Sequence, residues 1–221
     1  MCGRFAQTTP SADLVRLFQL VMGVEMTERF NIAPTQNVLV VRSHSEGNQA
    51  HWCRWGFVPS WAKSLTATSP LFNARSESVF DKPSFADSAR HHRCLIPASG
   101  FYEWRDTPAG KIPVLFTPKT DPLFRFAGLW SRWADNEGNL TYTTTILTTA
   151  ANETLEPFHH RMPVILTDSA CKTWIDPNVT EPHTLAPLMQ SAPPDAISFR
   201  PVSTRVNNGR NDDPTCWDAY K

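Results

Sequence analysis

Apolar residues recur at helical spacing near the start of the chain, in the segment TPSADLVRLFQLV at positions 9–21. The apolar stripe of this segment consists of Leu14, Leu17, Phe18 and Val21. Pro10 stands near the first turn, where proline is favoured, and Thr9 or Ser11 is available as the N-terminal cap. The pattern predicts one short amphipathic helix.

After this helix the sequence changes to β-branched and aromatic runs broken by turn residues, which is typical of strands. Strands are predicted at positions 37–43, 49–58, 94–104, 111–116, 123–130, 140–149, 161–167 and 196–203. The stretch from Asp135 to Asn139 has the composition of a hairpin loop and predicts antiparallel pairing of the strands beside it. Shorter helices are predicted at 82–91, at 167–175 with Thr167 or Ser169 as cap, and at 182–190.

Sheet therefore dominates the predicted structure. The chain has 19 prolines against nine glycines, which implies many stiff, ordered loops. No repeat, charge block or low-complexity linker indicates a domain boundary. We expect one α+β domain over residues 1–221, with a mostly antiparallel, strongly curved, barrel-like sheet system and a few flanking helices.

Charge and cysteine content narrow the function classes. Lys plus Arg equal Asp plus Glu at 21 each, so a nucleic-acid site must come from a few locally gathered cations. The five cysteines are odd in number and widely spaced, which argues against a zinc site and a disulfide framework, and no cofactor is expected. No run approaches the ~20 apolar residues of a membrane span, and no targeting segment is evident. We expect a cytoplasmic protein without a membrane partner, nucleoid-associated if the source is bacterial.

Cys2 stands directly behind the initiator Met1. Removal of Met1 would leave Cys2 with a free α-amine and a thiol on adjacent carbons, a pair that no internal cysteine offers. Such an aminothiol condenses with an aldehyde to an imine, and the thiol then closes onto the same carbon to give a thiazolidine. The reference pKa values of about 8 for the amine and about 8.5 for the thiol leave useful reactive fractions near neutral pH. The alternative for a single cysteine is an inert buried thiol.

Three polar clusters interrupt otherwise apolar runs. They contain Asn73, Arg75 and Glu77; Glu103; and His159, His160 and Arg161. Each cluster taken alone fits a solvated strand face or an ion pair. If they converge on one pocket, a nucleophile, a carboxylate and an imidazole together form a set for proton transfer.

Seven blocks in this order resemble the SRAP family. They are MCGRF at 1–5, NIAP at 31–34, WGFVPSW at 55–61, NARSE at 73–77, RCLIPASGFYEW at 93–104, GLW at 128–130 and HHRMPVIL at 159–166. The resemblance extends from Met1 to the RPVSTRVNN stretch at 200–208. It implies a protein that binds abasic sites in single-stranded DNA, removes its own Met1 and couples Cys2 to the ring-opened sugar as a thiazolidine. Crosslink reversal and an abasic-site lyase activity are candidate further reactions.

The resemblance also implies roles for individual residues. Cys2 would be the nucleophile, Asn73 would hold the sugar and the chain terminus, and Glu103 and His159 would move protons. The residue between the reacting histidine and the arginine, often acidic in the family, is His160 here, and the order His-x-Arg-Met-Pro selects His159. The candidate DNA-binding residues are Arg4, Pro34, Trp61, Arg75 and Arg161. Arginine suits phosphate oxygens and tryptophan suits base stacking, although Trp61 could equally be a core aromatic.

Two other classes compete with this reading. N-terminal-nucleophile amidotransferases also begin with Cys-Gly after Met, but the chain lacks the Asn-Gly and Gly-Asp blocks that hold glutamine. A non-covalent single-strand-binding module would use the arginines and tryptophans without Cys2. A monomer is expected in either DNA-binding case, with the replication machinery as a candidate partner.

Overall fold

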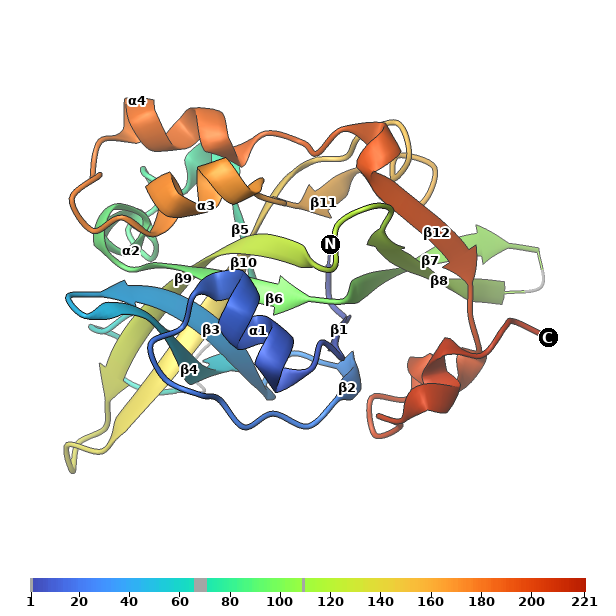
Figure 1. The fold of residues 1–221 in the computed structure, drawn as a ribbon, viewed down its shortest axis with the longest axis horizontal. Helices are drawn as coiled ribbons and strands as arrows, with labels where there is room; N and C mark the ends of the chain where they lie inside the picture. The colour runs from blue at the N-terminus through green and yellow to red at the C-terminus, as the bar shows by residue number, and fades with distance from the viewer. Residues whose placement is uncertain (1, 66–70, 109) are drawn as a thin grey trace.

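A closed barrel of five strands is the centre of the larger sheet in the computed structural model, which describes residues 2–65, 71–108 and 110–221 (Figure 1). Its strands are β3 (Asn37–His44), β4 (Gly47–Trp55), β6 (Arg93–Ala98), β9 (Phe124–Ala134) and β10 (Leu140–Ala150). The ring runs β10–β4–β3–β6–β9 and closes because β9 also pairs with β10. All neighbours are antiparallel except β4 and β10. Two short strands extend from β10, namely β5 (Asn73–Arg75) and β11 (Arg161–Pro163).

A second, fully antiparallel sheet packs beside the barrel. Its order is β12 (Ile197–Pro201), β8 (Gly110–Pro118), β7 (Gly100–Thr107), β1 (Phe5–Gln7) and β2 (Arg29–Ile32). Figure 1 shows β1 near the centre of the molecule, between the barrel and the β7–β8 pair. The start of the chain therefore belongs to the second sheet, and through Phe5 it packs against Trp55 of the barrel.

The predicted strand at 94–104 is wrong as a single element, because the chain changes sheets within it. β6 ends at Ala98 in the barrel, and β7 begins at Gly100 in the second sheet. A Cβ on Gly100 would lie 2.8 Å from the backbone oxygen of Phe116, so only glycine allows this close approach. This switch brings the second half of the block, which contains Glu103, to the start of the chain.

The helices agree with the predictions in position, with local corrections. They are α1 (Ser11–Phe18), α2 (Ala86–His91), α3 (Asp168–Ile175) and α4 (Pro182–Leu185), with 3₁₀ turns at Ser76–Ser78, Ala186–Met189, Pro194–Ala196, Thr204–Asn207 and Pro214–Trp217. Helix α1 ends earlier than predicted, because Gln19 adopts a left-handed φ of 51°, and Val21 is 46% exposed. The predicted cap of α1 is also wrong, since Pro10 occupies the cap position without a side-chain hydrogen bond. The Thr167 cap of α3 is confirmed.

The core fixes the position of the N-terminal strand. Phe5 is completely buried and packs edge-on against Trp55 at a centroid distance of 5.0 Å. Asn31 anchors the C-terminal segment to the same region, because its side-chain amide donates to three backbone carbonyls of residues 206–211. Its oxygen accepts a hydrogen bond from Arg4. The start of the chain is thus enclosed by segments distant in sequence.

The fold class is confirmed: one α+β domain with a mostly antiparallel, barrel-like sheet system and few helices. The hairpin at residues 135–139 joins antiparallel β9 and β10 as predicted. The short strands β1, β2 and β5 were missed, because three or four residues carry too little alternation to be recognised. Within the part of the chain that the structure describes, no helix combines the length and apolar character needed to cross a bilayer.

Candidate active site

Cys2 lies just before β1 and is tied to β5 through its own backbone. The side-chain amide of Asn73 donates a hydrogen bond of 2.9 Å to the Cys2 carbonyl oxygen. The Asn73 side-chain oxygen is buried, and no described residue gives it a hydrogen bond. Asn73 therefore positions the chain start while keeping one acceptor available.

A cavity of about 470 Å³ has two of the predicted catalytic residues in its wall. Glu103, on β7, and His159, in the loop between β10 and β11, both line it. The remaining lining residues are Trp104, Asp106, Lys111, Phe158 and Asn207. Glu103 also raises the pKa of the Cys2 thiol by its negative charge, second to burial. Cys2, Asn73, Glu103 and His159 are thus linked through one small region.

Burial controls the ionisation of the two acidic groups. Cys2 is completely buried, which raises the pKa of its thiol far above the ordinary value. Burial likewise raises the pKa of Glu103, whose side chain is 6% exposed. The expectation of a useful thiolate fraction near neutral pH does not hold for this buried thiol, because its surroundings do not solvate a negative sulfur.

His159 is oriented by the backbone that follows it. The Arg161 N–H donates a 2.9 Å hydrogen bond to Nδ1 of His159, so the neutral ring carries its proton on Nε2. Burial lowers the pKa of His159 below its usual 6.5. His160 stacks on His159 with a centroid distance of 4.4 Å but is exposed and does not line the cavity. The geometry therefore favours His159 as the functional imidazole.

The three candidate arginines differ in exposure and in the number of hydrogen bonds that their side chains make within the protein. Arg161 is 9% exposed and makes two hydrogen bonds of 2.6 and 2.8 Å to the Glu77 carboxylate, besides one to the Thr148 carbonyl. Arg4 donates to Asn31 and to the Val206 carbonyl, and its guanidinium lies 5.8 Å from the Trp104 ring centroid. Arg75 is exposed on β5, two residues from Asn73.

Two predicted DNA-binding residues lie outside this cavity. Trp61 is 67% exposed and lines a different cavity. Pro34 lies partly exposed in the turn that precedes β3. The structure thus links Cys2 to Asn73 and to Glu103, and neither Pro34 nor Trp61 is among the residues that line the cavity of Glu103 and His159.

Sequence reasoning missed several residues of the cavity wall. Lys111 adds a positive charge beside Glu103, while Phe158 and Trp104 supply apolar walls. Trp104 and Phe158 directly adjoin Glu103 and His159 in the sequence, and this adjacency was the available signal. Asn207 hydrogen-bonds the Trp104 indole from the C-terminal segment, a contact that no local pattern indicates. Among the described residues, no three His, Cys, Asp or Glu side chains are grouped as metal ligands.

Comparison with known proteins identifies the family. The model of the SOS response associated peptidase (SRAP) family matches residues 1–209, so the chain belongs to the SRAP family. The Bacillus subtilis protein called abasic site processing protein YoqW is 41% identical over 224 residues, which cover 100% of both chains. Abasic site processing protein YobE from the same organism is 39% identical over 212 residues, 94% of this chain and 97% of its own. A crystal structure of a Bacteroides thetaiotaomicron protein shares the fold, with a TM-score of 0.88, 24% identity and 99% coverage of each chain.

The Glu77–Arg161 ion pair predicts a pH-dependent stability contribution. The hydrogen bond from Arg161 lowers the pKa of Glu77 from 4.5, so the stabilisation is complete above pH 4.5 and is lost as the pH falls through the lower folded-state pKa. We expect Glu77→Gln to lower the free energy of unfolding by about 1 kcal/mol at pH 7, since the carboxylate is half exposed. This deficit should shrink as the pH falls below 4.5, measured by urea denaturation.

The control for this experiment is Glu153→Gln, which changes an exposed carboxylate elsewhere on the surface. A Glu77→Gln deficit that stays constant through the acid range would show that the ion pair is not its source.

Proposed function

We propose that this protein processes abasic sites in single-stranded DNA by forming a thiazolidine between Cys2 and the ring-opened sugar. The observation that carries the proposal is that Cys2 is hydrogen-bonded by Asn73 and interacts electrostatically with Glu103, which lines one cavity together with His159. The names of the full-length relatives as abasic site processing proteins support the substrate. An abasic deoxyribose opens to an aldehyde, which is the electrophile that an aminothiol captures.

Hydrolysis of the Met1–Cys2 peptide bond is the first step of the proposed reaction. It releases methionine and leaves the Cys2 amine free, which makes the protein an autoprocessing peptidase. The Asn73 side-chain amide would hold Cys2 in place through this step by its hydrogen bond to the Cys2 carbonyl oxygen. Glu103 is the candidate proton carrier for it, because burial raises the pKa of its carboxyl and makes the protonated form more accessible than for an exposed glutamate.

The coupling itself releases one water molecule. The amine nitrogen attacks the aldehyde carbon, and the carbinolamine loses its hydroxyl as water to form the imine. The thiol sulfur then bonds to the imine carbon, and the thiol proton passes to the nitrogen. The protonated form of His159 would donate its Nε2 proton to the sugar ring oxygen as the aldehyde opens, and the remaining Nδ1 proton can face the Arg161 carbonyl oxygen, 3.3 Å away. The buried Asn73 oxygen is available to a sugar hydroxyl.

The DNA strand would be held by cations around the cavity. Arg75 is the most accessible of these cations. Arg161 could bind a phosphate only if its ion pair with Glu77 were broken. Arg4 lies beside Trp104 on the cavity wall, and Pro34 and Trp61 would contact the strand outside the cavity. One chain supplies all four proposed catalytic residues, so the proposed reaction needs no second copy, and the monomer stays a prediction from the sequence.

Further reactions of the same site belong to the proposal. An imine at the sugar carbon acidifies the neighbouring proton, so β-elimination of the 3′ phosphate would give a lyase activity. Reopening of the ring would reverse the crosslink. The cytoplasmic or nucleoid location and the link to the replication machinery stay predictions from the sequence. A non-covalent binding module is the alternative, and it predicts equal binding of abasic and intact strands.

Replacing Cys2 by Ala is expected to abolish the covalent adduct while leaving strand binding largely intact. The thiol is lost, but the arginines and the cavity remain. The measurement is intact mass after incubation with an abasic single-stranded oligonucleotide. The parent should gain the oligonucleotide mass less one water on a chain that begins at Cys2.

Cys171→Ala, which removes another buried cysteine, is the matched control and should couple like the parent. An unchanged adduct with Cys2→Ala, or an adduct that retains Met1, would overturn the assignment.

Arg75→Ala is expected to weaken binding and to reduce the magnitude of the logarithmic salt slope by about 0.7, the contribution of one phosphate contact on a single strand. Arg200→Ala serves as control, because Arg200 is also exposed but lies on β12 in the other sheet. The slope is measured by fluorescence anisotropy across a salt series. Equal slopes for Arg75→Ala and the parent would exclude a phosphate contact at this position.

His159 and Glu103 are expected to affect different steps. His159→Ala should slow adduct formation by about 10²-fold, the size of a lost general acid. The deficit relative to the parent should grow as the pH falls toward the lowered pKa of His159, where the donating form accumulates. Glu103→Ala should impair Met1 removal and crosslink reversal more than the final yield. A time course with pre-trimmed protein, followed by a chase with competing abasic strand, separates these steps.

His160→Ala is the control for the imidazole, because His160 is exposed and does not line the cavity. Normal coupling in His159→Ala, or normal strand exchange in Glu103→Ala, would remove that residue from the mechanism.

A further inference from the structure

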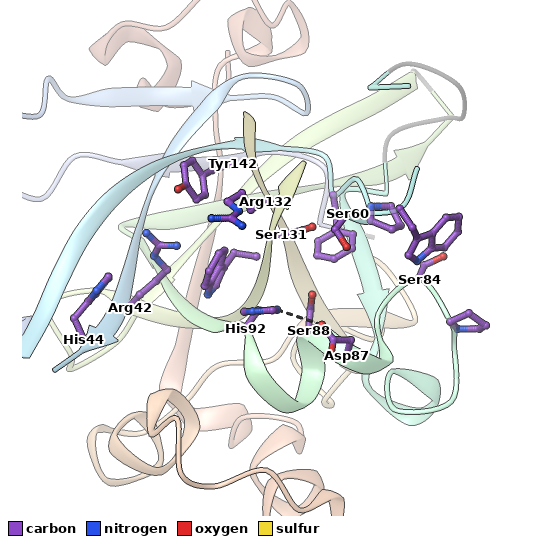
Figure 2. A pocket seen from close by; sticks show the side chains of 15 residues that line it. Arg42, His44, Ser60, Ser84, Asp87, Ser88, His92, Ser131, Arg132 and Tyr142 are labelled. Atoms are coloured by element: carbon purple, nitrogen blue, oxygen red, sulfur yellow. Dashed lines mark ion pairs between the residues drawn. The ribbon is translucent and has the colours of Figure 1, made fainter. Parts of the chain in front are cut away.

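A second cavity of about 580 Å³ opens beside the barrel and shares no lining residue with the one at Glu103 and His159. Strands β3, β9 and β10, helix α2 and the segment that follows β4 contribute to its walls. In Figure 2 the side chains of Arg42, Arg132 and Tyr142 gather at one end of the view, and Ser60 and Ser84 lie at the other. Of the residues that line this cavity, the proposed function uses Trp61 as a strand contact, and the crosslinking reaction itself uses none.

Arg42 is the unusual residue of this cavity. It is 7% exposed, and its guanidinium carbon lies 4.1 Å from the Trp130 ring centroid and 5.4 Å from that of Tyr142. No described residue accepts a hydrogen bond from the Arg42 side chain or forms an ion pair with it. Its buried Nε is without an acceptor. A guanidinium has five N–H donors, and aromatic faces satisfy none of them as an oxygen would.

The other buried arginines show what the fold normally supplies. Arg125 lies 2.7 Å from the Asp168 carboxylate, and Arg161 is paired with Glu77. Arg93 donates to the backbone carbonyls of Ala89, Arg90, Trp174, Asp176 and Val179. Arg42 alone among these four buried arginines faces a cavity with no oxygen partner. An uncompensated buried cation is costly, so an anion in the cavity would be stabilised.

The remaining groups define the charge and shape of the ligand. Arg132 is exposed at the same cavity and adds a second cation. Asp87, the one carboxylate among the lining residues, lies 3.4 Å from His92 and is directed to that ring. His44 contacts His51, whose pKa is lowered to about 4 by burial, so this pair adds no full charge at neutral pH. The exposed indole of Trp61 supplies a flat apolar surface.

We propose that this cavity binds a nucleotide, with its phosphate on Arg42 and Arg132 and its base against Trp61. Forked guanidinium donors match phosphate oxygens, and the serine hydroxyls suit a sugar. The volume lies within the range of small-molecule sites. The nucleotide is either free or a unit of a bound strand, since both present the same phosphate and base.

The test is a titration of ¹⁵N-labelled protein with deoxyadenosine monophosphate and, separately, with inorganic phosphate. The indole N–H signals of Trp130 and Trp61 report the two ends of the cavity. Both should shift with the nucleotide at millimolar concentration or below, and the nucleotide should bind more tightly than phosphate. Arg42→Gln should weaken binding about tenfold or more, the effect of losing charge-assisted hydrogen bonds.

Two controls keep the result interpretable. Arg105→Gln, at an exposed arginine on β7, should bind like the parent. Cys2→Ala should also bind like the parent, which separates this site from the proposed crosslinking reaction. Because Arg42→Gln removes an unpaired buried cation, it should resist urea at least as well as the parent, so loss of binding cannot be ascribed to unfolding.

Displacement of the bound nucleotide by an intact oligothymidine would assign the site to a strand, and its absence would assign it to a free nucleotide. The proposal is overturned if the Trp130 signal does not move with millimolar nucleotide. It is equally overturned if Arg42→Gln binds as tightly as the parent, or if phosphate binds as well as the nucleotide.

Discussion

Strand β10 is the element on which both the barrel and the candidate active site depend. It pairs with β9 and β4 to close the barrel, and its C-terminal half pairs with β5 and β11. Asn73 lies opposite Ile146, and Arg161 lies opposite Ala150, so one strand sets the spacing of both flanks of the site. A shift of register by one residue would turn Asn73 away from Cys2.

The threonine-rich sequence of β10 explains how it serves so many neighbours. Thr143, Thr144 and Thr148 are completely buried. The Thr144 hydroxyl donates to the Leu129 carbonyl, and that of Thr143 accepts from the Val58 N–H. β-branched threonine keeps the extended backbone, and its hydroxyl satisfies polar groups where strands diverge. An all-aliphatic strand would leave such groups unpaired inside the protein.

The sequence predicts what depends on local pattern. The long alternating runs of the barrel, the hairpin at 135–139 and the Thr167 cap could be recognised, because their signals lie within a few residues. The passage of the chain from one sheet to the other at Gly100 could not be recognised, since it depends on the Phe116 backbone, which approaches from another strand. In the site, the ordered blocks indicated Cys2, Asn73, Glu103 and His159. They did not indicate that Arg161 would be held by Glu77, because both side chains belong to clusters that fit solvent or DNA equally well.

Burial shifts the pKa values of two titratable groups of the cavity, Glu103 and His159, in opposite directions. It raises the pKa of Glu103, because a carboxylate loses hydration, and it lowers the pKa of His159, because an imidazolium does. The two pKa values, ordinarily about two units apart, therefore approach each other. Burial therefore narrows the difference in proton affinity between the two groups. If the two side chains were exposed, their pKa values would lie near the ordinary ones for Glu and His. The interactions of Cys2 with Asn73 of one sheet and Glu103 of the other thus fix its position, and the burial that results shifts the pKa values of the groups around it.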